Sequence, residues 1–305
     1  LRGADCMKKL LIFLVGLVFF TVTDQRILEE EAKKGRISET FYLEEDFRSQ
    51  PVSETFLEEI GNFEDPGEAV GFYFLETNYG EDTFHLTDAK TLAETEKLTE
   101  TKKWKKRMKW WQRQRGYEDY ADTCRQIWND VQYFPVASGN GADENRITFG
   151  NSWMHERTYG GKRGHEGTDL MPKENKRGTY PIVSMTDGIV SQKGWLEKGG
   201  YRLGILAPGG AYFYYAHLDS YANLKEGDLV KAGDFLGFMG DSGYGDEGTT
   251  GKFPVHLHVG IYLNRGEQEI SINPYPVLCY LKDRSVNSVR QVFSTTGAIQ
   301  EFMIY

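Results

Sequence analysis

The chain has 305 residues, 34 of them glycine, with 14% aromatic residues and a formal net charge of -9. This length allows one sizeable domain with extensions or two small domains. The composition favours a turn-rich β fold with a well-filled core. The negative charge gives the chain no overall attraction for nucleic acid, so we expect no nucleic-acid partner.

The first 23 residues resemble a targeting segment. Met7-Lys8-Lys9 supplies a short positive region, and residues 10–22 form an almost unbroken apolar run. The run is shorter than the ~20 residues of a usual membrane span and fits the ~7–15 residues of a secretory signal core. No small-x-small cleavage site follows, so a signal peptide and a membrane anchor both stay open, and a buried helix is less favoured. We expect the true start at Met7 and an extracytoplasmic protein, secreted or anchored at the cell envelope.

Residues 24–135 predict an acidic spacer followed by a helical region. The stretch 25–96 is rich in glutamate without clear apolar period, which favours a poorly ordered spacer with one strand-like patch at residues 72–75. A helical stretch is expected over residues 92–131, and Phe134-Pro135 ends it. Six basic residues and three tryptophans fall within 102–111. We favour an amphipathic helix packed on a neighbour over a nucleic-acid, lipid or wall-polymer contact.

Residues 136–283 predict an antiparallel β domain, because short apolar runs alternate with turn signals. One hairpin is expected between Pro181 and Val190 through Asp187-Gly188, and another over residues 202–216 through Pro208-Gly209-Gly210. The fold class is therefore mainly β, an antiparallel sheet or β-roll behind a partly helical extension. Residues 284–305 form a C-terminal extension with no predicted role.

Two cysteines follow Met7, at positions 124 and 279. In an exported protein Cys124 and Cys279 can form one disulfide. Two unpaired buried thiols fit the sequence equally well.

The strongest chemical signal is the pair His256 and His258, which flank Leu257 in an apolar run. Alternate residues of a strand face the same side, so both imidazoles point one way while the apolar residues face a core. A lone histidine is usually structural, whereas such a pair on an apolar strand indicates a metal or catalytic site.

A second signal is the segment 164–170. It begins like the helical zinc motif His-Glu-x-x-His, but Asp169 stands where the second histidine would be. Gly167 disfavours a helix. In an extended chain, positions four apart return to one face, so His165 and Asp169 can converge on one point. Taken alone, this pattern is weak.

Together the two segments predict a zinc site. Hydrolytic zinc takes three protein ligands from nitrogen and carboxylate oxygen and leaves a fourth position for water. His165, Asp169 and one histidine of the later pair supply that set. The other histidine of the pair and His217 can then move a proton and stabilise an oxyanion.

Several motifs resemble, in their order along the chain, those of the lysostaphin-type murein metalloendopeptidases. They are residues 165–169, 181–190, 215–218, 230–233 and 256–258, and the resemblance covers about residues 150–278. It implies a zinc endopeptidase that hydrolyses peptide cross-links of bacterial peptidoglycan.

The resemblance also implies the roles of single residues. His165, Asp169 and His258 would hold one zinc ion, His256 and His217 would act in catalysis, and Tyr159 would donate to the transition state. Where many members of the family carry proline before the histidine pair, this chain has valine, with proline one place earlier.

Other readings of the sequence compete with this one. A non-catalytic envelope scaffold or hydrolase activator on the same fold typically lacks one or more ligands, and all five residues are present here. Residues 225–234 resemble the strand and turn pattern of biotin- and lipoyl-carrier domains, which we interpret as shared β architecture. His85 and His155 are expected at the surface, and residues 241–248 form either a groove wall or a long connection. The cleaved bond and the oligomeric state do not follow from the sequence.

Overall fold

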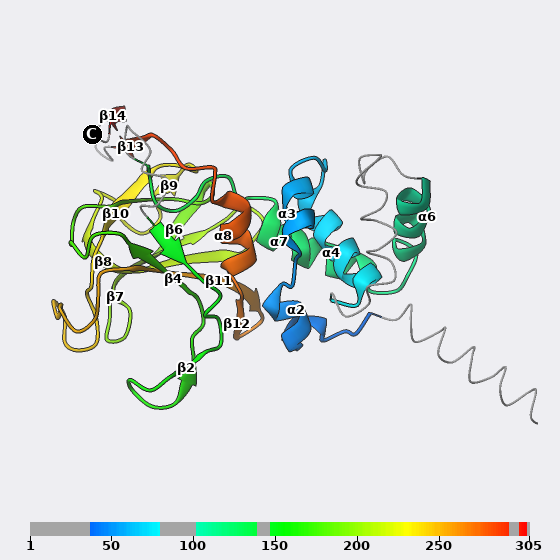
Figure 1. The fold of residues 1–305 in the computed structure, drawn as a ribbon, viewed down its shortest axis with the longest axis horizontal. Coiled ribbons are helices and arrows are strands. Elements are labelled where there is room, and N and C mark those ends of the chain that lie inside the picture. The colour runs from blue at the N-terminus through cyan, green and yellow to red at the C-terminus, as the bar shows by residue number, and fades with distance from the viewer. Residues whose placement is uncertain (1–36, 80–101, 139–146, 293–298, 304–305) are drawn as a thin grey trace, which may run out of the picture.

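The computed structural model describes residues 37–79, 102–138, 147–292 and 299–303. Figure 1 shows a β domain with a helical region at one end. The expected targeting segment and His85 lie outside the described residues. Within them, every helix is too short or too polar to cross a bilayer.

The helical region is built from short helices. They are η1 (Phe41–Leu43), α2 (Glu45–Ser49), α3 (Glu54–Ile60), α4 (Pro66–Thr77), α6 (Lys102–Trp111) and α7 (Tyr117–Trp128). The expectation of a poorly ordered acidic spacer is therefore wrong for residues 37–79, which form four of these helices.

The patch at residues 72–75, expected as a strand, lies inside α4. The helix starts where the Asp65 side chain accepts a hydrogen bond from the Glu68 amide, with Pro66 in the first helical position. Phe72 and Phe74 are both buried, although they do not share a face of the helix. Neighbours cover α4 on several sides, so its apolar residues lack the spacing of a surface helix.

The helical stretch expected over residues 92–131 is two helices in its described part. α6 and α7 are separated by a turn through Gly116, whose φ is 86°. The amphipathic interpretation of α6 is confirmed, because Trp104 packs edge-on against Phe72 at 4.3 Å between ring centroids. Trp111 also donates a 2.6 Å hydrogen bond to Glu76. The second helix ends at Trp128, before the predicted Phe134-Pro135 boundary.

The predicted antiparallel β domain is confirmed. Its ten-stranded sheet runs in the order β1-β4-β11-β8-β7-β6-β9, while β12 pairs with β11 and β10 pairs with β5 and β8. The strands of the sheet are β1 (Ile147–Phe149), β4 (Thr168–Pro172), β5 (Pro181–Val183), β6 (Gly188–Leu196), β7 (Gly200–Leu206), β8 (Tyr212–Tyr221), β9 (Leu229–Val230), β10 (Phe235–Met239), β11 (Leu257–Arg265) and β12 (Gln268–Ile272). The hairpin over residues 202–216 is present as β7 and β8, with Leu206 opposite Tyr212.

The other expected hairpin, between Pro181 and Val190, is wrong. β5 pairs with β10, whereas β6 pairs with β7 and β9. The segment between β5 and β6 does not form a hairpin, because the Asp187 side chain contacts the turn before β10. It accepts a 2.9 Å hydrogen bond from the Ala232 amide and pairs with Lys231 at 2.7 Å.

The disulfide hypothesis is also wrong, because Cys124 and Cys279 are both free thiols. Cys124 on α7 is buried against α4, where a Cβ added to Gly71 would lie 3.0 Å from its sulfur. Cys279 lies on α8 (Tyr275–Leu281) and hydrogen-bonds Tyr275 of the same helix. The C-terminal extension contains the antiparallel strands β13 (Ser288–Val292) and β14 (Ile299–Met303).

The helical region docks against β12 and the start of α8. Arg48 Nε donates to the Ser271 carbonyl at 3.0 Å, and Asn273 Nδ2 donates to the Ser49 carbonyl at 3.0 Å. Buried Trp128 donates to Gln50 Oε1 at 2.8 Å within the helical region, and its ring centroid lies 6.2 Å from that of Tyr280 on α8. Buried apolar residues of the helices and the sheet form one continuous cluster, so the two regions share a core.

Close packing of α4 on α7 gives a stability prediction. A Cβ at Gly67 would lie 2.4 Å from Arg125 Cα and 2.6 Å from its nitrogen, which is backbone that cannot rotate away. We expect Gly67→Ala to lower the free energy of unfolding by about 1–3 kcal/mol through overpacking. Chemical denaturation would measure this change. Gly150→Ala is the control, because its Cβ would meet nothing within 4 Å. Equal stability of the two variants would contradict the packing.

Candidate active site and metal centre

Three predicted ligands meet where β4 and β11 pair. His258 lies directly opposite Asp169 in the register of these strands. His165 follows the two-residue strand β3 (Arg163–Gly164) and reaches the same point. His165 Nε2 lies 2.9 Å from His258 Nδ1, and each of these nitrogens lies 3.0 Å from Asp169 Oδ1.

This donor set fits zinc. Two nitrogens and one carboxylate oxygen, each bonded to zinc at ~2.0–2.1 Å, lie roughly 3 Å apart. Burial alone would raise the pKa of Asp169, but the two imidazoles beside it, His165 and His258, outweigh burial and hold that pKa well below its usual value. Burial lowers the pKa of His258 despite the neighbouring carboxylate. Asp169 is therefore ionised and His258 neutral, which are the forms that bind a metal.

Gly167 makes room for the third ligand. A Cβ at this position would lie 2.5 Å from His258 Cε1 and 2.5 Å from the Val259 carbonyl oxygen. The glycine that argued against a helix in the sequence thus allows the Cε1–Nε2 edge of the His258 ring to lie against the segment between His165 and Asp169.

Two further residues, which the sequence did not single out, orient the ligands. His165 Nδ1 lies 3.0 Å from the Ser152 carbonyl oxygen, so we assign its proton to Nδ1 and the lone pair to Nε2. Arg157 Nη2 donates to Asp169 Oδ2 at 2.6 Å, which leaves Oδ1 facing the histidines. Neither residue belongs to a periodic pattern. Arg157 lies on β2 (Glu156–Arg157), where a single charge gives no signal in the sequence.

The contact with Arg157 gives a prediction about metal affinity. Arg157→Gln removes the charged partner that orients the Asp169 carboxylate. We expect zinc affinity to fall by about 10–100-fold, as for other residues that orient a metal ligand. Competition with a chromogenic chelator would measure it. Lys162→Gln is a suitable control, because Lys162 pairs with Glu156 at the exposed surface. An unchanged zinc affinity in Arg157→Gln would exclude this role.

The two predicted catalytic histidines lie beside the ligands. Their ring centroids are 4.6 Å apart, and His256 Nε2 lies 3.7 Å from Asp169 Oδ1. His256 Nδ1 lies 2.8 Å from the Pro254 carbonyl oxygen, and His217 Nδ1 lies 2.8 Å from that of Ser242. We assign the Nδ1 proton to these bonds in both rings, which leaves each Nε2 as a proton acceptor. Burial lowers the pKa of both histidines, so both are neutral at pH 7.

The backbone at His217 is unusual, with a φ of 63°. Non-glycine residues in this region cost of order 1–3 kcal/mol and cluster at functional sites. The His217 amide donates to the Gly199 carbonyl at 2.8 Å, which together with the ring contact to Ser242 holds the strained conformation.

Tyr159 does not line the groove with the other predicted residues. Its ring stacks on Tyr244, with centroids 3.9 Å apart and planes inclined by 1°. Tyr244 itself lines the groove, and its ring centroid is 6.3 Å from that of His217. Tyr244 therefore contributes to the groove wall, which agrees with the first of the two roles predicted for the loop 241–248. His155, expected at the surface, is exposed.

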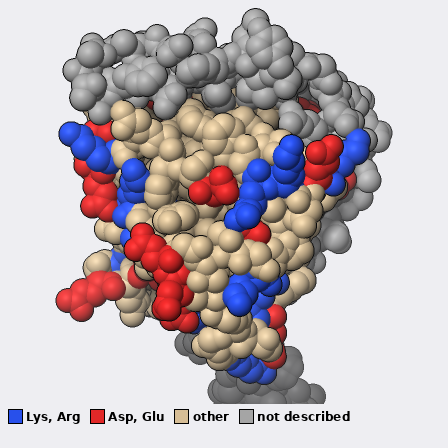
Figure 2. Space-filling view, turned by 90° about the vertical axis from the view of Figure 1, so that its left-hand side faces the viewer, with Lys and Arg blue, Asp and Glu red and all other residues tan. Residues whose placement is uncertain are grey.

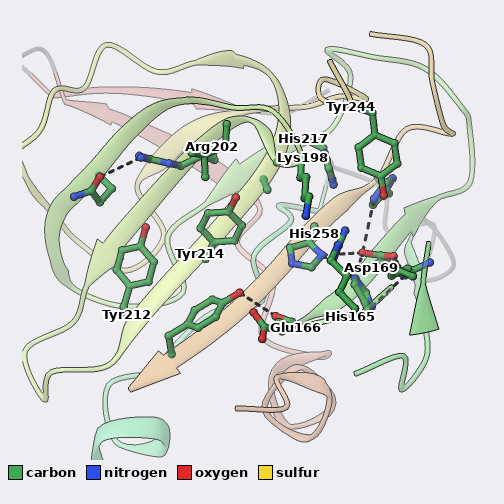
Figure 3. A pocket seen from close by; sticks show the side chains of 18 of the residues that line it. His165, Glu166, Asp169, Lys198, Arg202, Tyr212, Tyr214, His217, Tyr244 and His258 are labelled. Atoms are coloured by element: carbon green, nitrogen blue, oxygen red, sulfur yellow. Dashed lines mark hydrogen bonds and ion pairs between the residues drawn. The ribbon is translucent and has the colours of Figure 1, made fainter. Parts of the chain in front are cut away.

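The three predicted ligands and both predicted catalytic histidines line one groove of about 860 Å³. Its described lining comes entirely from residues 157–269, so the helical region takes no part. Figure 3 shows Tyr212, Tyr214 and Arg202 along the floor to one side of the metal ligands, and Tyr244 on the other side. On the face of the β domain turned toward the viewer in Figure 2, basic and acidic side chains are interspersed, and neither sign forms a continuous patch.

Comparisons with known proteins agree with this geometry. The family model described as peptidase family M23 matches residues 163–274, and that of the LytM N-terminal domain matches residues 33–130. A crystal structure from Ruminococcus gnavus, provisionally named a glycyl-glycine endopeptidase LytM, is 53% identical with a TM-score of 0.72. That similarity covers 82% of this chain and 95% of the other.

Two named relatives match shorter stretches. The L-Ala–D-Glu endopeptidase of Bacillus subtilis is 42% identical over 132 residues, which is 43% of this chain and 39% of the relative. Lysostaphin of Staphylococcus staphylolyticus is 31% identical over 100 residues, 32% of this chain and 19% of the relative. The chain thus spans about two fifths of the first and one fifth of the second. This chain matches 95% of the LytM-like structure at 53% identity, and the M23 family model matches residues 163–274. The chain therefore belongs to peptidase family M23.

Proposed function

We propose that this protein is a zinc-dependent endopeptidase that hydrolyses peptide cross-links of bacterial peptidoglycan. The observation that carries the proposal is the triangle of His165 Nε2, Asp169 Oδ1 and His258 Nδ1, with mutual distances of 2.9–3.0 Å, on the wall of an open groove. Relatives named as an L-Ala–D-Glu endopeptidase and as glycyl-glycine endopeptidases support the same class of substrate.

The proposed chemistry needs one metal ion at these ligands. When bound there, zinc polarises the scissile carbonyl and lowers the pKa of water to about 7. Three protein ligands leave one coordination position for that chemistry. Ser152 and Arg157 keep the His165 and Asp169 donors turned toward this point.

The two neutral imidazoles handle the proton. His256 Nε2 faces the ligand cluster while its Nδ1–H donates to the Pro254 carbonyl, so Nε2 takes the proton of the attacking water and passes it to the leaving amine. His217 Nε2 supplies a second polar group beside it. We keep Tyr159 as the proposed donor to the developing oxyanion. Its ring stacks on that of Tyr244, which lines the groove.

We further propose that the protein acts outside the cytoplasm, where its peptidoglycan substrate lies. The apolar run at residues 10–22 supports export as a signal peptide or anchor. We expect no nucleic-acid partner, because the formal net charge of -9 gives the chain no overall attraction for nucleic acid.

Purified cell walls provide the test. The zinc-loaded full chain is incubated with one wall carrying glycyl bridges and one with direct cross-links, and mass spectrometry identifies new amino termini. We expect soluble fragments from at least one wall, their loss with a chelator and their return with added zinc. Two intact walls in the presence of zinc-loaded protein would refute the proposal.

A further inference from the structure

The groove has an excess of positively charged side chains, unlike the chain as a whole. Four cationic side chains line it against three carboxylates, although the chain has a formal net charge of -9. Arg157 is paired with Asp169, but Arg163, Lys198 and Arg202 have no carboxylate partner in the described part of the chain. A zinc ion would add further positive charge to the same groove. Clefts that concentrate one sign of charge attract ligands of the opposite sign.

Lys198 is the cation that lies beside both the β2–β3 loop and the segment next to His217. It lies in the turn between β6 and β7, and its side chain is exposed. A Cβ built at Gly160 would lie 3.2 Å from Lys198 Nζ, so the ammonium reaches the β2–β3 loop that borders the metal ligands. A Cβ built at Gly243 would meet both the Lys198 carbonyl at 2.8 Å and His217 Nδ1 at 3.3 Å, which places the lysine backbone next to the catalytic histidine. Figure 3 shows the Lys198 side chain directed toward His258.

Arg202 continues the positive strip along β7. Its Nη2 donates to Gln192 Oε1 at 3.0 Å, while Nη1 is shielded from solvent and has no hydrogen-bond partner in the described residues. In Figure 3 Arg202 lies above Tyr214 on the groove floor. Burial raises the pKa of Tyr214, so its hydroxyl stays protonated and can donate.

We propose that Lys198 binds a substrate carboxylate next to the metal centre, with Arg202 adding positive charge farther along the groove, so that the preferred substrate is a wall peptide with a free carboxylate near the scissile bond. This rests on the proposed function and narrows its substrate class. Charge-assisted hydrogen bonds from ammonium and guanidinium groups to a carboxylate are the strong ones. A glycyl bridge is neutral along its length and leaves both cations unpaired.

Matched peptides test the substrate class. One peptide carries a free glutamate carboxylate beside the scissile bond and a free C-terminal carboxylate. Two others carry a carboxamide at one of these positions only, and a fourth is a pentaglycine peptide. With the zinc-loaded full chain, we expect amidation of one position to lower kcat/KM by about 10-fold or more, mostly through KM. The sensitive position identifies which carboxylate is bound.

Variants of Lys198 test whether the preference for a free carboxylate depends on the charge of this residue. Lys198→Gln should lower kcat/KM for the free-carboxylate peptide by about 10-fold or more and change the rate for the amidated peptide little. Lys198→Arg should keep the preference, because it keeps the charge. Lys225→Gln is the matched control, since Lys225 is an exposed turn lysine outside the groove lining. Zinc content is measured for every variant and should not change.

The outcomes separate this inference from the proposed function. If the wild-type protein cleaves free and amidated peptides equally, or if Lys198→Gln slows both equally, the carboxylate subsite is refuted while the endopeptidase stands. Preferred cleavage of pentaglycine would also refute it. If the wild-type protein cleaves no peptide and no wall, the proposed function itself fails.

Discussion

Replacement of His258 by alanine is expected to abolish zinc binding and activity together. The His258 Nδ1 atom supplies one corner of the ligand triangle, and its ring is buried against Gly167. Replacing a residue that only orients a ligand typically lowers metal affinity by about 10–100-fold. Removing a direct ligand should cost more, so we expect zinc affinity to fall by more than about 100-fold. Zinc content after dialysis and release of wall fragments are the two measurements.

His155→Ala is the matched control for this variant. His155 is an exposed histidine close in sequence to the site, and only its backbone bonds His165. It should keep full zinc content and activity. Stoichiometric zinc together with normal wall cleavage in His258→Ala would show that the ligand assignment is incorrect.

His256→Ala should separate metal binding from turnover. His256 lies outside the triangle of ligand atoms, and its Nε2 is the proposed proton acceptor. We expect zinc content to stay at the wild-type level while kcat falls by about 10²–10⁴-fold, the usual contribution of general acid–base catalysis. KM should change little, because substrate contacts elsewhere in the groove persist.

Single-turnover cleavage of a defined peptide measures this loss, with zinc determined on the same sample. His217→Ala should also reduce kcat and retain zinc, since His217 belongs to the same side of the groove. A His256→Ala protein that turns over at the wild-type rate would exclude His256 as the proton acceptor. Loss of zinc from it would move His256 into the ligand set.

The β domain was largely predictable, but the helical region was not. Strand pairs such as β7 and β8 are joined by local turn chemistry at Pro208-Gly209-Gly210, which the sequence displays directly. α4 gave no helical signal, because Phe72, Tyr73 and Phe74 are consecutive and all buried. α4 is buried because it packs against α7 and neighbouring aromatic rings. The local periodicity of the sequence does not reveal tertiary packing of this kind.

The pairing of β5 with β10 illustrates the same difficulty. The sequence offered Asp187-Gly188 as a turn, and the aspartate does serve a turn, but that of Lys231 and Ala232 rather than its own. Nothing in the segment 181–190 distinguishes these two uses of the side chain. Long-range pairing of this kind depends on contacts about 45 residues apart, which local turn chemistry does not encode.

The convergence of the metal ligands could be foreseen because chemistry limits the choices. Zinc accepts few residue types, and strand alternation places His256 and His258 on one side. The side chains that tune the site could not be foreseen in the same way. Arg157 and Lys198 are single charges on or beside turns, where the sequence alone gives no reason to separate them from ordinary surface residues.

Anomalous scattering at the zinc absorption edge, from crystals of the full chain grown with zinc, tests the metal centre most directly. The account predicts one strong peak in contact with His165 Nε2, Asp169 Oδ1 and His258 Nδ1. A peak bound elsewhere, or no peak at these three atoms when zinc is in excess, would contradict it.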